Sequence, residues 1–412
     1  MYSLQLSPEQ LEIRDTVRDF VTREIKPAAL KADRLDVADR SLLWAQIDAA
    51  SQLGLRTLAL SEQHGGAGAD ALTACIVTEE LAAGDADIAA VLTETSRLSH
   101  LLFDLAMSDA QRDAFLPKLQ NSDRYHLAFA GPEAGSDTRL GVNYHRAPAA
   151  EAVVKTTAVK AGNDFVVNGV KDCVANAPIA GLFAVLVRIA GRPDPAVLLV
   201  PAGAPGVSVK AHADAWPHGS HGTVTFQDCR VPAGNLLGAD AAALLTGANV
   251  AGRGSPLYQA LNLGIGRAAY EAALDYAHIR VQGGRPLIEH QAIGTKLAET
   301  IVRLEIARAT VWQAAWASDH PDAVADRSLS DLPLTTIAQV FTSEAVMKAA
   351  KDSAEIFGAM GVMRDMPLQK YIHDARVCLH ANDGNSDAKL RIAEAIAGFR
   401  RADPSAMALA GE

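Results

Sequence analysis

Basic clusters, paired cysteines and long apolar runs are all missing from this 412-residue sequence, and each absence excludes a class of function. The formal net charge is −10, and no stretch interleaves Lys or Arg with aromatic residues, which argues against nucleic-acid binding. The four cysteines, Cys75, Cys173, Cys229 and Cys378, show no CxxC spacing. Neither a disulfide framework nor a zinc or other metal site is therefore indicated.

The sequence also has no run of about 18 apolar residues, the length that a membrane-spanning helix needs. Its first residues, MYSLQLSPEQ, do not combine a basic segment with an apolar one as a secretion signal does. Hydrophobic residues make up 49% and charged residues 21%, values that suit a folded chain with two or three cores. We expect a cytoplasmic protein without a membrane span.

Helix signals dominate the first part of the chain. Ser7 is expected to cap a helix that has Pro8 at its first position and Gln10 completing a capping box. Further helices are predicted over 42–52, 71–83 and 88–107, which are rich in Ala and Leu. A glycine-rich segment at 64–70 interrupts them, and from the residues alone it is either a helix connector or a loop near a ligand.

The pattern then changes to short β-prone runs, followed by long helices. Strands are predicted over 152–160, 164–175, 182–189, 196–201, 207–212 and 222–231. Helices are predicted over 257–280, 290–318, 334–357 and 368–379, with a loop at 320–333. The predicted fold class is α+β, with an N-terminal helical domain at 1–126, a middle β-domain at 127–240 and a C-terminal four-helix bundle at 241–412.

The segment 127–137, LAFAGPEAGSD, stands where the helical pattern gives way to strands. Gly131 and Gly135 allow the main chain to approach a ligand closely, and Pro132 stiffens the turn. Ser136 and Asp137 add oxygen acceptors beside free main-chain donors, which suits an extended ligand that carries phosphate. From the residues alone, a plain strand connection remains the alternative.

Five segments in order resemble the acyl-CoA dehydrogenase family, and together they span nearly the whole chain. The first, 127–137, is similar to the family's TEPGAGSD segment, and FVVNGVKDCVANAP at 165–178 is similar to its NG-K-WITN segment. HGSHGTVTFQDCRVPAGNLLG at 218–238 resembles the end of its β-domain. RVQGGRPLIEHQAI and EIFGAMGVMRDMPLQKYIHDAR resemble its arginine-bearing segment and its glycine-rich segment with RDAK. Five ordered matches make chance similarity a minor alternative.

The resemblance implies an FAD enzyme that removes the α-proton of an acyl-CoA with a carboxylate while the β-hydride passes to the flavin. It also implies a tetramer or a heteromer with a homologous subunit, and an electron-transfer flavoprotein or similar acceptor as a partner. Arg280 occupies the position from which the family reaches the FAD pyrophosphate of a neighbouring subunit. The positions that the resemblance assigns to cofactor contact are Leu127, Ala130, Ser136, Cys173, Ala175, Arg280, His290, Gln291, Glu355, Gly358, Ala359 and Asn385.

Several of these positions depart from the family pattern. Ala130 and Gly131 replace the usual Thr-Glu, which removes a hydroxyl that would bond to the flavin. Cys173 and Ala175 replace Trp and Thr, so an aromatic wall and another hydroxyl are also absent. Glu355 replaces a Gln, and its negative charge would repel a pyrophosphate unless a cation neutralised it.

The catalytic carboxylate has two candidate positions. Alignment without a gap places the family's glutamate at Asn382, and an amide cannot act as a base; one inserted residue places it at Asp383, followed by Gly384. Asp383 is accordingly predicted to be the base. A loop or capping aspartate beside Gly384 is the alternative. A second family position for the base, at 253–256, holds no acid here.

Three functions follow from these matches and departures. The leading one is an FAD-dependent acyl-CoA dehydrogenase that introduces an α,β-double bond. The second is a non-catalytic or half-site subunit that pairs with an active homologous chain. The third is a flavin-dependent monooxygenase of the same fold, which needs no carboxylate base and in which His380 would meet the substrate; an ordinary histidine at a helix end is the alternative.

Overall fold

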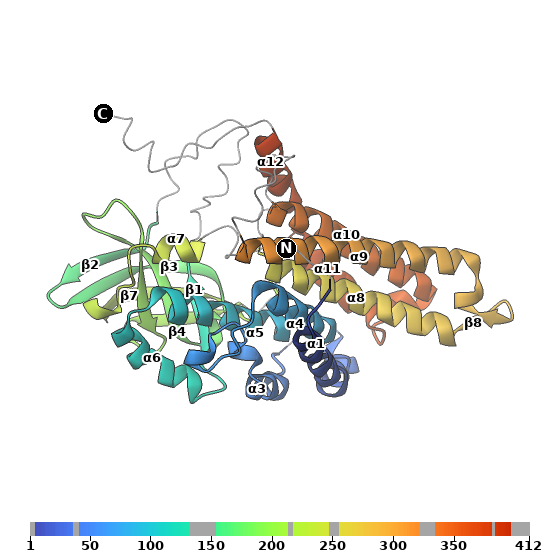
Figure 1. The fold of residues 1–412 in the computed structure, drawn as a ribbon, viewed down its shortest axis with the longest axis horizontal. Coiled ribbons are helices and arrows are strands. Elements are labelled where there is room, and N and C mark those ends of the chain that lie inside the picture. Colours follow the sequence, from blue (N-terminus) through green and yellow to red (C-terminus); the bar gives the residue numbers. More distant parts are fainter. Residues whose placement is uncertain are drawn as a thin grey trace.

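The computed structural model shows an elongated molecule with a sheet toward one end, a helical bundle toward the other and shorter helices alongside both (Figure 1). It describes residues 5–35, 41–131, 133, 154–212, 217–246, 255–320, 334–380 and 384–396. Ser136, Asp137, Asn382 and Asp383 lie outside these ranges. So do residues 321–333 of the predicted bundle loop and residues 253 and 254 of the second base position.

The N-terminal part is helical, as predicted. Its first helix begins as expected, because the Ser7 hydroxyl accepts from the Gln10 N–H and the Gln10 side chain accepts from the Ser7 N–H. The helix predicted over 88–107 is instead α5 followed by a π-helical segment, His100–Ala106. The helices of this part are α1 (Pro8–Phe20), α2 (Lys26–Ala29), α3 (Trp44–Gln52), α4 (Ala71–Gly84), α5 (Ala86–Ser99) and α6 (Asp109–Gln120).

The middle part is one seven-stranded sheet with the order β1-β4-β2-β3-β7-β6, and β5 pairs with β4 outside this path. β4 connects the two parts of this sheet. Most of its residues pair with β1 and β5, while only its last two residues pair with β2. The strands are β1 (His126–Ala130), β2 (Thr157–Ala161), β3 (Asp164–Ala175), β4 (Ala180–Ile189), β5 (Ala196–Pro201), β6 (Val207–Ala211) and β7 (His221–Pro232).

Strands β1, β4 and β5 are covered on both faces. Phe183 and Val185 point into a core shared with β3 and β7, whereas Leu182 and Ala184 point into a core shared with α5, α6 and the π-helical segment. This double burial explains why 182–189 reads as a continuous apolar run rather than an alternating one. The sheet is thereby fixed to the N-terminal helices.

The C-terminal part is a bundle whose helices pack on α4 and α5 as well as on one another. Buried ion pairs complete this contact: Arg267 Nη2 lies 2.6 Å from Glu80 Oε2, and Arg308 Nη2 lies 2.8 Å from Glu79 Oε1. Its elements are α7 (Ala241–Thr246), α8 (Pro256–Ile279), β8 (Val281–Gln282), β9 (Arg285–Pro286), α9 (Gln291–Asp319), α10 (Leu334–Phe357), α11 (Leu368–His380) and α12 (Gly384–Ile396).

Candidate functional site

The candidate cofactor positions on β1 are buried inside the protein. Leu127 and Ala130 are each 0% exposed, and they belong to the two cores on opposite faces of the strand. Neither side chain faces open space in this structure, so a ligand could meet these two residues only at their main chain. Ser136, from the same motif, lies outside the described residues.

A buried ion pair follows β1 and was missed by sequence reasoning. Lys171 Nζ lies 2.6 Å from Glu133 Oε1, with the side chains 0% and 3% exposed. Lys171 also donates to the Gly131 carbonyl at 3.2 Å, and Glu133 accepts from the N–H groups of Lys155 and Thr156. In the family motif the glutamate stands at 131 and a glycine at 133. Here the two residue types are exchanged, and that exchange was the signal available in the sequence.

The pKa values of both partners are lowered, for different reasons. Burial lowers the pKa of Lys171, and its hydrogen bond to Glu133 only partly opposes this. Burial alone would raise the pKa of Glu133, but the hydrogen bonds from Lys171 and Thr156 outweigh it and leave this pKa below its usual range. The pair therefore needs both partners charged, and it ties the end of β1 to the middle of β3.

A bulge in β3 positions Cys173 and Ala175. The pairing with β7 shifts between Lys171 and Val174, and Cys173 has a φ of 52°, in the left-handed region. Such a conformation costs a non-glycine residue about 1 kcal/mol or more. Cys173 and Ala175 are both half-buried at this edge of the sheet. Unlike the β1 positions, they keep exposed surface.

A buried polar network joins β1, the end of β3 and α5. The Asn176 amide donates to the Val91 carbonyl at 3.0 Å and to Thr95 Oγ1 at 3.2 Å. Thr95 Oγ1 also lies 3.1 Å from His126 Nδ1. Burial and the nearby Arg56 charge lower the pKa of His126 to about 4, so this histidine is neutral near pH 7. The network holds the sheet on the helices and engages the Asn176 side-chain N–H groups inside the protein.

The second set of candidate positions lies at the far end of the bundle, at the turn from α8 into α9. Arg280 is the C-cap of α8 and is exposed, and a hairpin of two two-residue strands, β8 and β9, follows it. Gly283 and Gly284 form its turn with φ of 57° and 82°, which suits glycine. His290 Nε2 donates to the Gln282 carbonyl at 3.0 Å, so this side chain closes the hairpin onto the start of α9.

The end of α10 reaches the same place. Phe357 stacks on Tyr276 of α8 with ring centroids 4.1 Å apart and planes 11° apart. Gly358 (φ 58°) and Ala359 follow and are exposed. The Glu355 carboxylate pairs with Lys296 of α9, and this hydrogen bond lowers the pKa of Glu355 and raises that of Lys296. The charge that replaces the family's glutamine is thus neutralised.

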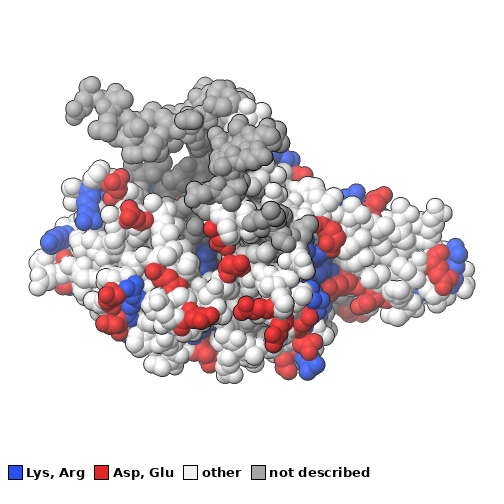
Figure 2. Space-filling model, in the orientation of Figure 1, with Lys and Arg blue, Asp and Glu red and all other residues white. Residues whose placement is uncertain are grey.

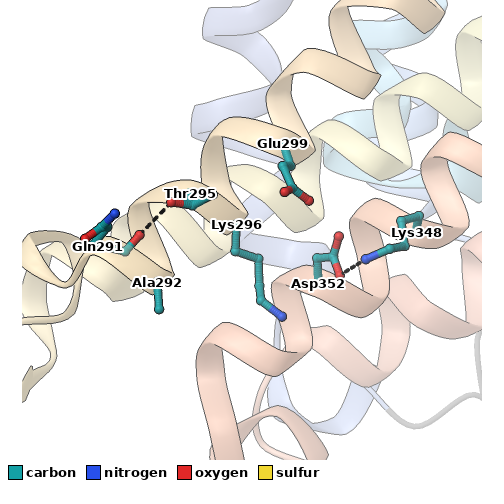
Figure 3. Close-up of a pocket in the computed structure, with 7 residues that line it drawn as sticks. All are labelled: Gln291, Ala292, Thr295, Lys296, Glu299, Lys348 and Asp352. Atoms are coloured by element: carbon teal, nitrogen blue, oxygen red, sulfur yellow. Dashed lines mark hydrogen bonds and ion pairs between the residues drawn. The ribbon is translucent and has the colours of Figure 1, made fainter.

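A cavity of about 580 Å³ opens between α9 and α10 beside this end (Figure 3). The Asp352 carboxylate is 2% exposed, and Lys348 bonds to its Oδ1. Its Oδ2 has no hydrogen-bond partner, and Arg303 Nη1 lies 3.8 Å from it. The lining residues are Gln291, Ala292, Thr295, Lys296, Glu299, Lys348 and Asp352.

The structure therefore brings the predicted residues together in two groups rather than one. Figure 1 places β1 and β3 in the half of the molecule that holds the sheet, and β8, which follows Arg280, at the opposite tip. We call these two groups the sheet end (Leu127, Ala130, Cys173 and Ala175) and the bundle tip (Arg280, His290, Gln291, Glu355, Gly358 and Ala359). Within one chain they lie a large part of the long axis apart.

Asn385 and the base candidates belong to neither group. Asn385 Oδ1 accepts from Ser343 at 3.1 Å and its amide donates to Glu344 at 3.2 Å, so it fastens α12 to α10. Asp383 and Asn382 lie outside the described residues, and His380 is exposed at the last position of α11. The choice between the two base positions stays a prediction.

Three further findings concern the molecule as a whole. On the face drawn in Figure 2, Lys and Arg side chains are interspersed with Asp and Glu. Among the described residues, no three His, Cys, Asp or Glu side chains are grouped in a way that could hold a metal ion. None of the helices that the structure describes has the length and apolar character needed to cross a membrane.

Comparison with known protein families gives three matches in chain order. The models for the N-terminal, middle and C-terminal domains of acyl-CoA dehydrogenases match residues 7–123, 127–229 and 252–397. The chain is 31% identical over 406 residues to an acyl-CoA dehydrogenase of Bacillus subtilis, covering 96% of this chain and 100% of that one. It is 30% identical over 401 residues to the cyclohexane-1-carbonyl-CoA dehydrogenase of Geobacter metallireducens, covering 95% and 98% of the two.

Solved structures with the same arrangement include butyryl-CoA dehydrogenase from Megasphaera elsdenii, with a TM-score of 0.79 and 25% identity over 96% of this chain and 100% of that one. A glutaryl-CoA dehydrogenase from Mycobacterium smegmatis, in complex with FADH2, matches with a TM-score of 0.79 over 96% of each chain. At 21% identity the second likeness shows the fold alone. The predicted order of helical, β and helical parts is confirmed by these matches.

Proposed function

The chain belongs to the acyl-CoA dehydrogenase family, and we propose that it is an FAD-dependent enzyme that introduces an α,β-double bond into an acyl-CoA thioester. The observation that carries this proposal is the bundle tip. It presents an exposed arginine, glycine turns and a Glu355 whose charge Lys296 neutralises. Together they suit a phosphate-bearing cofactor.

The residues present fit FAD better at the bundle tip than at the sheet end. At the tip, Arg280 would hold the pyrophosphate, and Gln291, Gly358 and Ala359 would flank it. At the sheet end, the hydroxyls and the indole of the family pattern are absent, so we propose main-chain contacts near Ala130 and a side-chain contact from Cys173. When bound, the flavin supplies an acceptor for the substrate's β-hydride.

The chain's own contribution to the chemistry is a base and a shielded surface. We propose that Asp383, in its ionised form, removes the α-proton from an acyl-CoA held about 3–3.5 Å away. The buried Lys171–Glu133 pair and the Asn176 network give the sheet end a rigid wall. A wall that does not need to reorganise favours close positioning of the substrate.

The separation of the two groups implies that a complete site needs two chains. We propose a homotetramer built of dimers, in which the bundle tip of one chain completes the sheet end of another. We also propose that the chain divides into domains at residues 1–126, 127–240 and 241–412. An electron-transfer flavoprotein or a similar protein is proposed as the electron acceptor. A heteromer with a homologous chain would meet the same geometric need.

The experiment is to express the chain alone, measure its FAD content from the absorbance spectrum, and add a panel of acyl-CoA thioesters without oxygen. The proposal predicts stoichiometric FAD and bleaching of the flavin by at least one thioester. Asp383→Asn should retain FAD and slow bleaching by about 10²–10⁴-fold, because only the proton acceptor is lost. Asp365→Asn, an exposed aspartate on the turn before α11, is the matched control and should bleach like the parent.

A second function has one specific observation in its favour. The sheet end has lost several side-chain contacts to flavin, whereas the bundle tip keeps Arg280, His290 and Gln291, which is what a subunit that completes a partner's site would show. Such a chain, expressed alone, would contain no FAD, and adding an active homologous chain would restore flavin binding. Oxygen consumption with a reduced-flavin donor, but no bleaching by thioesters, would instead indicate the monooxygenase.

A further inference from the structure

A buried charged cluster lies where the three parts of the chain meet. Asp85 and Asp87 come from the start of α5, His218 from the segment before β7, and Lys370 and Asp374 from α11. Lys370 Nζ lies 2.7 Å from Asp374 Oδ2 and 3.7 Å from Asp85 Oδ2. Each of these side chains is nearly or wholly buried, with Asp87 the most exposed at 14%.

His218 touches both other parts of the chain at once. Its Nε2 donates to the Asp374 carbonyl at 3.2 Å, and its Nδ1 lies 3.5 Å from Asp87 Oδ1. The N–H of the next residue, Gly219, donates to the same Asp87 oxygen at 2.9 Å. The Cys378 side chain, one turn after Asp374, contributes to raising the pKa of the ring. Since both ring nitrogens face acceptors, the contacts suit the doubly protonated imidazolium.

The charges of the cluster also favour the imidazolium form of His218. The cluster holds three carboxylates, and Lys370 is the other cation among its described members. Burial alone would lower the pKa of His218, but its bonds to Asp87 and Cys378 outweigh this and hold the pKa well above its usual range. Burial likewise opposes ionisation of Asp87, yet His218 lowers its pKa to about 2. Burial raises the pKa of Asp85, and the Lys370 charge partly opposes this.

We propose that His218 is a positioning residue that fixes the C-terminal half of α11 against α5 and ties the sheet to both helical parts. The carbonyl that it engages lies within the last two turns of α11, and Tyr258 of α8 contacts Cys378 Sγ at 3.9 Å from the other side. Its relevance to catalysis rests on the proposed function, because α11 ends at His380, directly before the segment that carries Asp383.

The first test is hydrogen exchange of the main-chain amides of residues 374–380, read by mass spectrometry in the full chain. His218→Gln keeps a side-chain amide donor but removes the charge, and we expect exchange in this turn to be at least about tenfold faster. His212→Gln is the control, since His212 bonds to Thr223 within the sheet and should leave α11 unchanged. Unchanged exchange in a folded His218→Gln variant would overturn the proposal.

A second variant keeps the test decisive if His218→Gln does not fold. Asp87→Asn preserves the imidazole and removes the carboxylate that faces it, so it should speed exchange at the same turn by a smaller factor. Faster exchange in α5 alone, with α11 as protected as in the parent, would show that His218 does not couple α5 to α11. Both readouts are independent of activity: a chain that fails to bleach with thioesters but shows these changes contradicts the proposed function and not this inference.

The third test reads the charge of His218 directly. With ¹³C-labelled histidine, the signal that disappears in His218→Gln should keep the position of the charged ring from pH 6 to pH 8. The other groups facing the cluster are His373, Tyr258, Tyr371, Cys378 and the acids named above. An ordinary titration near pH 6.5 would contradict the assigned form of the ring.

The same charge predicts a pH-dependent stability. Because the folded pKa is raised, the contribution of His218 is full below about pH 6.5, declines as the pH rises, and is gone above the folded pKa. The difference in Tm between parent and His218→Gln should therefore shrink as the pH is raised from 6 to 9. A Tm difference that stays constant over this range would count against a stabilising charge on His218.

Discussion

The sheet end and the bundle tip differ in what their residues do inside the chain. At the sheet end, Leu127 and Ala130 are fully buried, and Glu133 and Lys171 satisfy each other. At the bundle tip, Arg280, Gln291 and Gly358 are exposed, and a Cβ at Gly284 or Gly358 would meet no atom within 4 Å. Substitutions at the sheet end are therefore expected to change the stability of the folded chain, and substitutions at the bundle tip are expected to change ligand binding. The predictions below probe this difference, beginning with the largest expected effect.

Glu133→Gln should be the most damaging change at the sheet end. It leaves the Lys171 ammonium, 0% exposed, without its carboxylate, and breaking a buried pair in this way costs about 3–5 kcal/mol. Urea unfolding would measure the loss. The double variant Glu133→Gln with Lys171→Met removes both charges and should recover a large part of it. A single variant as stable as the parent would show that the pair is not held as tightly as its geometry indicates.

Arg280→Ala should affect binding and leave folding intact, because the side chain is exposed. The loss of a charge-assisted contact to phosphate is expected to weaken FAD binding by about 1.5–3 kcal/mol, or roughly tenfold to a hundredfold. Titration of the apoprotein with FAD measures this. Arg285→Ala, in the same hairpin, is the control. Equal effects of the two changes would mean that only the general positive charge of the tip matters.

Acidification should destabilise the sheet end through His126. Its pKa is lowered to about 4 in the folded chain, so the unfolded chain binds more protons between that value and about 6.5. Stability from this site is thus complete above about pH 6.5 and is lost as the pH falls, by about 2 kcal/mol between pH 7 and pH 5. His126→Gln should flatten this dependence in urea unfolding. A parallel dependence in the two proteins would exclude His126 as its source.

Glu355→Gln restores the family residue at the bundle tip and should have the smallest effect. The pair with Lys296 is mostly exposed, at 62% for Glu355, and such pairs contribute about 0–1 kcal/mol. We expect a change in Tm of no more than about 2 °C. FAD should bind slightly tighter, because Lys296 is released to face the ligand. Weaker binding would indicate that Glu355 itself contacts the cofactor.

The sequence predicted the fold through local signals that survive without tertiary context. The capping box at Ser7 and Gln10 and the bounds of β3, β5 and α10 follow from cap chemistry and periodicity. The π-helical segment after Ser99 and the short hairpin after Arg280 were not predicted. Neither has a periodic signature, and the Gly283-Gly284 turn of the hairpin was the local signal that was overlooked.

The sequence predicted which residues belong to the candidate site better than where they lie in the fold. Motif matching named residues at both ends of the molecule, but it could not say that Ala130 is sealed in a core while Arg280 is exposed. It also overlooked Glu133, because a glycine was expected there, and His218, because its partners lie 131 and 156 positions away in the chain at Asp87 and Asp374. Contacts between distant residues leave no periodic trace in a single sequence.

The distance between the sheet end and the bundle tip has a consequence for mixtures of defective chains. Under the proposed function, a chain impaired at its tip still offers a sound sheet end, and a chain impaired at its sheet end still offers a sound tip. When both are refolded together, mixed dimers would contain one site assembled wholly from undamaged parts, so about a quarter of all sites would recover with random pairing. Two inactive preparations would then complement each other on mixing, and in a cell carrying both alleles the defects would be partly recessive to one another.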